Sequence, residues 1–141
     1  MKPLVLGFVG KIGSGKSTVS TAVAEALGWP RTGFGDYVRA LAAEKGLAVD
    51  RQTLQRLGES LVNEGPTEFC RAVLNQANWE PGKSAVVDGI RHTAIVSALR
   101  ETVAPTELLL VFVAVADSVR ETRVQKRDGQ NQVTQIGRAH V

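Results

Sequence analysis

The chain has 141 residues, of which 43% are hydrophobic and 22% are charged, and its formal net charge is +3. This length suits one globular domain with a buried core. The Lys and Arg residues form no block, which argues against a nucleic-acid surface. No run reaches the about 18 apolar residues of a membrane span, and a lone cysteine, Cys70, excludes a disulfide framework and a thiolate metal cluster. We therefore expect a cytoplasmic protein without nucleic-acid or membrane partners, as a monomer or small homo-oligomer.

Strand and helix signals alternate along the chain. Leu4–Val9 is a continuous apolar run, typical of a strand buried on both faces of a parallel sheet. Lys16–Leu27 reads as a helix that ends at Gly28. Further strands are expected at 31–34, 84–89 and 107–115. Further helices are expected at 36–45, 92–102 and 118–127, with two more over about 51–78, the second of them opening at Pro66 and running through Ala77. This alternation predicts an α/β fold with a parallel sheet and helices on both faces.

Two of the helix starts carry their own local signals. Asp50 is placed to cap the helix whose apolar stripe includes Leu54 and Leu61. Pro66 suits the first turn of the helix that follows. Residues 80–83 read EPGK, which predicts a turn before the second buried strand.

The last residues of the chain do not continue this pattern. After Asp128 the apolar periodicity stops, although a doubly wound domain normally needs at least one more strand and helix. The ending IGRAHV is what the codons ATC GGA AGA GCA CAC GTC give, which looks like part of a common sequencing adapter. We therefore expect a single domain over residues 1–134 and a non-native or disordered tail over 135–141. A flexible natural tail is the alternative.

Residues 7–18 read GFVGKIGSGKST and contain a phosphate-binding pattern. The pattern G-x-x-x-x-G-K-[ST] is matched directly between a predicted strand and a predicted helix, by Gly10, Gly15, Lys16 and Ser17. The glycines let successive backbone N–H groups turn toward phosphate oxygens, and the helix adds its positive N-terminal end. The pattern directs Lys16 to the β- and γ-phosphates and the Ser17 hydroxyl to magnesium. A glycine-rich turn without a ligand is the alternative. The expected ATP-binding residues are Gly10, Lys11, Ile12, Gly13, Ser14, Gly15, Lys16, Ser17 and Thr18.

An acid and two arginines follow at places that favour the same site. Asp88 ends a predicted strand, at the sheet edge where the phosphate loop is expected, and a carboxylate there can hold magnesium through water. An Asp-Gly pair is also common in turns. Arg91 follows at this edge and Arg39 lies one turn into a predicted helix. Their planar forks suit a phosphate, although single surface arginines are common. Asp36 is a helix N-cap or, toward a hydroxyl acceptor, a general base.

The segment RETRVQKRDG carries three arginines at helical spacing. Arg120, Arg123 and Arg127 therefore share one face of a predicted helix. They either close over a transferred phosphoryl group and neutralise its charge, or they form the solvated face of a surface helix.

The quoted segments resemble the nucleoside monophosphate kinase branch of the phosphate-loop proteins. Adenylate kinases carry GSGK, then G-D-x-x-R, then D-G-F-P-R; this sequence has GKIGSGKST, GDYVR and DGIR in that order, and the resemblance covers about residues 4–128. The segment DGIR lacks the proline and the loop reads GKST instead of GKGT, which is more similar to adenylate-kinase-like and archaeal P-loop kinase families with a DGIR motif. Dephospho-coenzyme A kinase is also similar, in its GGIGSGKST loop and an R…RDG segment.

The resemblance implies a three-layer P-loop NTPase fold with a helical acceptor-binding part at about 35–78 and a lid at about 118–130. It implies ATP and Mg²⁺ as cofactors, and transfer of the γ-phosphoryl group to a nucleoside monophosphate or a similar phosphorylated small molecule. It implies catalysis by Lys16, Asp88, Arg123 and Arg127, acceptor binding by Asp36, Arg39 and Arg91, and magnesium binding by Ser17 and Asp88.

Three other functions stay open from the sequence. The first is a dephospho-coenzyme A kinase. The second is a regulatory NTPase without an acceptor, although the Asn-Lys-x-Asp guanine reader of GTPases is missing from the sequence. The third is a truncated, inactive kinase.

Overall fold

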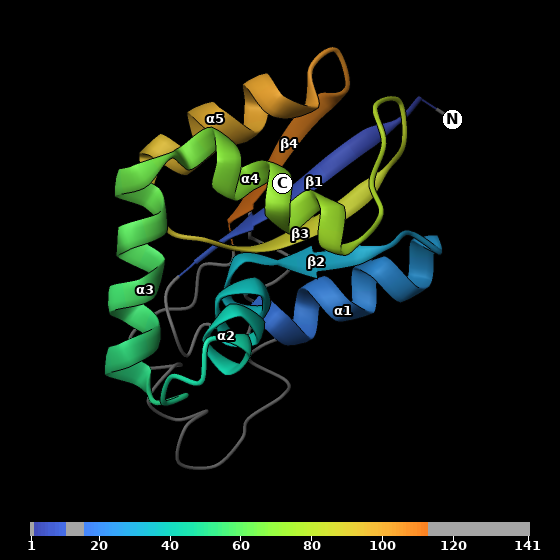
Figure 1. The fold of residues 1–141 in the computed structure, drawn as a ribbon. Coiled ribbons are helices and arrows are strands. Elements are labelled where there is room, and N and C mark those ends of the chain that lie inside the picture. The colour runs from blue at the N-terminus through green and yellow to red at the C-terminus, as the bar shows by residue number, and fades with distance from the viewer. Residues whose placement is uncertain (1, 11–15, 113–141) are drawn as a thin grey trace.

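The computed structural model describes residues 2–10 and 16–112 (Figure 1). The described elements, in chain order, are β1 (Leu4–Val9), α1 (Lys16–Leu27), β2 (Arg31–Gly33), α2 (Phe34–Glu44), α3 (Arg51–Glu64), α4 (Pro66–Gln76), β3 (Ala85–Ile90), α5 (Thr93–Val103) and β4 (Glu107–Phe112). The predicted alternation of strands and helices is confirmed over this part of the chain. The predicted helix at 118–127, the lid at 118–130 and the tail at 135–141 lie outside the described residues.

The described strands form one parallel sheet in the order β2-β3-β1-β4. The central strand β1 pairs with β3 on one side and with β4 on the other, so that Val5 lies opposite both Ala85 and Leu108. Both faces of a parallel sheet are covered by its crossover helices, which is why these strands are continuous apolar runs and do not alternate with polar residues. The predicted fold class is therefore confirmed.

Helices lie on both faces of the sheet, which makes three layers (Figure 1). On one face, α1 packs Ala24 over Leu6, Phe8 and Val86. On the other face, α2, α4 and α5 build the larger core around the opposite side chains of the same strands, with Val5, Val87, Ile90 and Leu108 from the sheet and Phe34, Val38, Phe69, Cys70, Val73, Leu74, Ile95 and Leu99 from the helices. Burying one such large side chain contributes about 1.5–3 kcal/mol. The two cores, one on each face, fix the position of the strands and therefore of their carboxyl ends.

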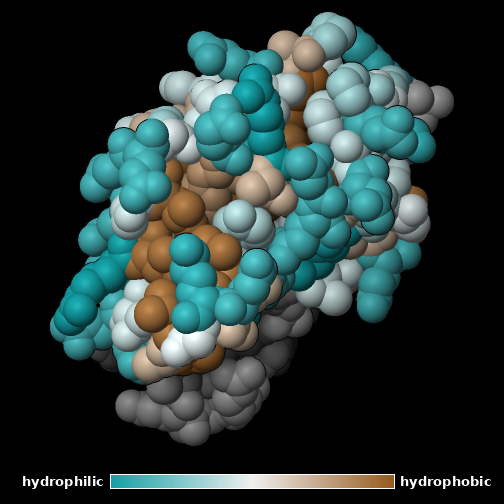
Figure 2. Space-filling model, viewed as in Figure 1, coloured by the Kyte–Doolittle hydropathy of each residue, from teal (hydrophilic) through white to brown (hydrophobic). Residues whose placement is uncertain are grey.

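Helix α3 lies outside these layers and has no fully buried residue. Its apolar stripe is half-buried against α2 and α4, and includes Leu54, Leu57 and Leu61. Figure 2 shows apolar side chains gathered on the surface beside this helix. An apolar stripe that is only half covered leaves hydrophobic surface next to α2.

The local signals for helix ends predicted the structure well. The Asp50 carboxylate accepts a hydrogen bond from the Thr53 backbone N–H at 2.8 Å and caps α3. Pro66 is the first residue of α4, and Gly28 follows α1 with a positive φ of 70°. No helix in the described part of the chain combines the length and the apolar character that crossing a membrane requires.

One prediction at a helix start was wrong. Of the two roles considered for Asp36, that of a helix N-cap is wrong, because α2 begins at Phe34 and its N-cap is Gly33. Because β2 ends at Gly33, strand and helix follow each other without a loop. The absence of a Cβ at Gly33 matters here, since that atom would lie 3.3 Å from the Asp36 carboxylate. Asp36 therefore sits in the first turn of α2, directly above the end of β2.

Candidate active site

The phosphate-binding pattern and Asp88 meet at one edge of the sheet. Strand β1 ends at Val9, and Gly10 follows it; β3 lies beside β1 and carries Asp88 near its own carboxyl end. Helix α1 begins at Lys16 and covers the sheet face on which the Asp88 side chain lies. Neighbouring parallel strands present their carboxyl ends at a common edge, where open α/β sheets bind ligands. The backbone thus places the acid beside the predicted phosphate loop.

The Asp88 carboxylate is buried and bound through one oxygen. Its side chain is 5% exposed. Its Oδ2 accepts a hydrogen bond from the Ser20 hydroxyl at 2.8 Å and another from Arg31 Nη2 at 2.5 Å. Arg31 Nε also donates to Ser20 Oγ at 3.0 Å, which closes a ring of three residues from β2, α1 and β3. A buried carboxylate requires a cation and hydrogen bonds, and this ring supplies both.

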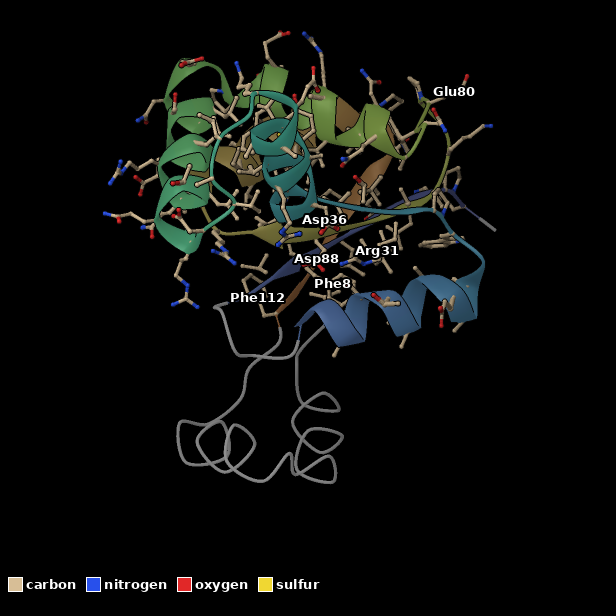
Figure 3. The ribbon with its side chains drawn as sticks, turned by 60° about the horizontal axis from the view of Figure 1, so that its bottom comes forward. Phe8, Arg31, Asp36, Glu80, Asp88 and Phe112 are labelled. Atoms are coloured by element: carbon tan, nitrogen blue, oxygen red, sulfur yellow. The ribbon has the colours of Figure 1, made fainter. Side chains whose placement is uncertain are left out.

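Arg31 also reaches α2, which the resemblance assigned to the acceptor-binding part. Its Nη1 donates to Asp36 Oδ2 at 3.2 Å, and Arg39 Nη1 donates to the other oxygen of Asp36 at 3.0 Å. Figure 3 shows Arg31, Asp36 and Asp88 together between α1 and α2. The side chains of Asp36 and Arg39 are about half exposed, at 47% and 56%, so this end of the network faces solvent. One chain of charges therefore runs from the buried sheet edge to the surface of α2.

Sequence reasoning found Asp36, Arg39 and Asp88 but missed Arg31 and Ser20. Arg31 stood only in a predicted short strand, and no motif includes it. Ser20 lies four residues after Lys16, on the helix that follows the phosphate loop. No signal in the sequence identified either residue, because it is the pairing of β2 with the distant β3 that brings Arg31 beside Asp88.

Other predicted site residues are placed only in part. Arg91 follows β3 directly and is exposed, with no hydrogen bond or ion pair to another residue in the described ranges. The loop residues Lys11, Ile12, Gly13, Ser14 and Gly15 lie outside those ranges, as do the side chains of Lys16, Ser17 and Thr18. The same holds for Arg120, Arg123 and Arg127.

The described donor set fits a magnesium ion held with a nucleotide. Ser20 and Arg31 both bind Oδ2 of Asp88, and no hydrogen bond joins Oδ1 to another side chain that the structure describes. A carboxylate oxygen is a preferred magnesium ligand, directly or through water, and substrate phosphates complete such sites. Within residues 2–10 and 16–112 no group of three or more His, Cys, Asp or Glu side chains is placed to hold a metal.

Cys70 is buried in the core, and burial raises the pKa of its thiol to about 12.

Comparisons with known proteins agree with this geometry. The sequence profile of a P-loop family described as "AAA domain" matches residues 6–138. A UPF0200 protein of Pyrobaculum aerophilum is 32% identical over 123 residues, which cover 87% of this chain and 66% of the relative. A UPF0200 protein of Methanothrix thermoacetophila is 31% identical over 136 residues, which cover 96% of this chain and 73% of the relative. The chain spans about two thirds of the length of these relatives.

Solved structures resemble the fold over nearly the whole chain. A gluconokinase from Sinorhizobium meliloti 1021 superposes with a TM-score of 0.55 at 24% identity, covering 96% of this chain and 74% of that protein. A sugar kinase from a Janibacter species superposes with a TM-score of 0.50 at 18% identity, covering 95% and 78%.

The fold and the sheet-edge site thus define a phosphate-loop protein with a kinase-like architecture. More particularly, the chain belongs to the P-loop family described as "AAA domain" and to the UPF0200 proteins.

Proposed function

We propose that this protein transfers the γ-phosphoryl group of Mg-ATP to a nucleoside monophosphate or a similar phosphorylated small molecule. The observation that carries the proposal is the continuous network from Asp88 through Arg31 to Asp36 and Arg39. It joins an acid beside the phosphate-loop pattern to an arginine on the helix of the predicted acceptor side.

The roles follow from charge and placement. The loop N–H groups and Lys16 would hold the ATP phosphates, and Arg39 and Arg91 would hold the acceptor phosphate in line with them. Bound magnesium would neutralise charge on the phosphates. Asp88, through Oδ1, and Ser17 would be its protein ligands. Arg123 and Arg127 would add positive charge over the transferred group.

The hydrogen bonds of Asp36 favour an acceptor that is already an anion. Both of its carboxylate oxygens accept hydrogen bonds from guanidinium groups, one from Arg31 and one from Arg39. A carboxylate engaged in this way is poorly placed to take a proton from a hydroxyl group. A phosphate acceptor needs no general base, so the reaction then depends on positioning and electrostatics.

The body of the acceptor would lie beside α3. This helix leaves part of its apolar stripe uncovered next to α2, which carries Asp36 and Arg39. Tyr37 of α2 and Leu54 of α3 are half-buried and offer apolar surface for a base or another planar group. An acceptor bound there would have its phosphate near Arg39.

The proposal is tested by an ADP-release screen. The protein is mixed with ATP and Mg²⁺ and then with each common nucleoside monophosphate, dephospho-coenzyme A or gluconate. We expect ADP release that depends on one phosphorylated acceptor, and Lys16→Ala should abolish it because that residue carries the charge of the loop. Release only with dephospho-coenzyme A would identify that acceptor. Release without any acceptor would instead indicate a regulatory NTPase, and retained transfer in Lys16→Ala would contradict the phosphate-loop assignment.

A further inference from the structure

Arg31 uses all three of its guanidinium nitrogens on different residues. Nε donates to Ser20, Nη2 to Asp88 and Nη1 to Asp36. These partners come from three different elements, α1, β3 and α2. The Arg31 side chain is 24% exposed and Asp88 only 5%, so the contacts to Asp88 and Ser20 are largely buried, while the contact to Asp36 lies at the surface.

Strand register explains how the three partners come together. Arg31 lies opposite Val86 in the pairing of β2 with β3, and Asp88 is two residues further along β3. Side chains two residues apart on a strand share a face, so Arg31 and Asp88 both face α1 and its Ser20. The intervening Thr32 faces the other way, and its hydroxyl donates to the Val73 carbonyl oxygen of α4 at 2.8 Å.

Within the described part of the chain, Arg31 is the one cation paired with Asp88. Because Arg31 and Ser20 both bind Oδ2, they fix the plane of the carboxylate and leave Oδ1 without a described partner. A planar fork can bind two acids and a hydroxyl at once, whereas the ammonium group of a lysine is a single point charge. The choice of arginine therefore determines how Oδ1 is oriented at this edge of the sheet.

We infer that Arg31 is a positioning residue that orients Asp88 toward the magnesium of the bound nucleotide and ties it to Asp36 on the acceptor side. This inference rests on the proposed function. Partners of metal ligands typically change metal affinity by about 10–100-fold when they are replaced, because they set the orientation of the ligand. Arg31 would act in this way without touching either substrate.

The test measures how much magnesium tightens ATP binding. The dissociation constant for ATP is determined by calorimetry with Mg²⁺ and with EDTA, for the full chain and for Arg31→Lys, which keeps the buried charge but not the fork. The expected result is that the tightening by magnesium falls by about tenfold in Arg31→Lys, while the magnesium-free constant stays unchanged. Arg71→Lys is the matched control, since Arg71 pairs with Glu68 on the exposed face of α4.

Two further variants separate positioning from folding. Asp88→Asn removes the carboxylate that Arg31 is proposed to orient. The double variant Asp88→Asn with Arg31→Lys should therefore lose no more of the magnesium effect than Asp88→Asn alone. Ser20→Ala keeps both charges and removes one donor to Oδ2, so it should lower the magnesium effect in the same direction even if Arg31→Lys does not fold.

The outcomes distinguish this inference from the proposed function. An unchanged magnesium effect in folded Arg31→Lys, or in Ser20→Ala where Arg31→Lys does not fold, would overturn the positioning role. So would additive losses in the double variant. A full chain that shows the expected magnesium effects but phosphorylates no acceptor would contradict the proposed function alone.

Discussion

Arg31 of β2 and Asp88 of β3 form an ion pair across neighbouring strands, with the carboxylate side chain 5% exposed and the guanidinium 24% exposed. The pair lies under α1 at the carboxyl end of the sheet, where the loop between β1 and α1 also begins. A charge pair in this position costs desolvation energy, so it is weak evidence for stability as such. Its place beside the phosphate-binding pattern is the reason that the proposed function includes it.

Breaking this pair should destabilise the fold strongly. Arg31→Met leaves the Asp88 carboxylate buried with only the Ser20 hydroxyl as a described partner, and we expect a loss of about 3 kcal/mol in the free energy of unfolding. Arg71→Met removes an exposed pair with Glu68 and should cost about 0.5 kcal/mol or less. Urea unfolding of both variants measures the two losses, and equal losses would show that the Arg31 pair does not behave as buried.

Two glycines should respond oppositely to alanine. A Cβ at Gly7 would lie 2.8 Å from Ile90 Cδ1 and 3.2 Å from Leu110 Cδ2, within the packed core, so Gly7→Ala should cost about 1–3 kcal/mol. A Cβ at Gly35 would meet nothing within 4 Å, so Gly35→Ala in α2 should stabilise by about 0.5–1 kcal/mol. Thermal unfolding compares the two variants. A stabilising Gly7→Ala would contradict the close packing of β1 against β3 and β4.

The Asp50 cap should make stability depend on pH. Hydrogen bonds from the Thr53 backbone N–H and hydroxyl hold the pKa of Asp50 below its ordinary value of 3.8. Because the folded-state pKa is the lower one, the cap stabilises the fold above 3.8 and loses this effect as the pH falls through the folded-state pKa.

The Asp50 experiment compares melting temperatures. Asp50→Ala should melt below the unmodified chain near neutral pH, and the difference should shrink in strong acid. Asp50→Asn keeps a capping oxygen without a titratable group, so its melting temperature should show less of this acid-dependent loss. A difference between the alanine variant and the unmodified chain that stays constant from neutral to acid pH would rule out the cap as its cause.

The acceptor-side arginines should affect the acceptor more than ATP. If the proposed function holds, Arg39→Ala and Arg91→Ala each remove a charge-assisted contact to the acceptor phosphate, and we expect the acceptor KM to rise or kcat to fall by about tenfold or more. ATP affinity should change little, because neither residue lies in the phosphate-loop pattern. Steady-state kinetics with both substrates varied measures this, with Arg71→Ala as the control. A loss confined to ATP affinity would show that these arginines are assigned to the wrong substrate.

Local and periodic features of the sequence were sufficient to predict the elements of the fold. Apolar runs predicted β1, β3 and β4, and helical periodicity with Asp50, Pro66 and Gly28 predicted the helices to within a few residues. These signals are readable because each depends only on neighbouring residues. The spacing of the glycines and Lys16 likewise indicated a phosphate loop without any knowledge of the fold.

Tertiary structure alone decided which residues share the site. The order β2-β3-β1-β4 places β2 beside β3, which follows it only after three helices, and no local pattern encodes that pairing. This pairing places Arg31 opposite Val86, two residues before Asp88, so that both side chains contact Ser20 of α1. Likewise, the loop-free step from β2 into α2 moved Asp36 from the expected cap position into reach of Arg31. The sequence by itself determined an acid and a phosphate-loop pattern at strand ends, because both follow from local spacing, whereas long-range packing determined that Arg31 joins this acid to Asp36 on α2.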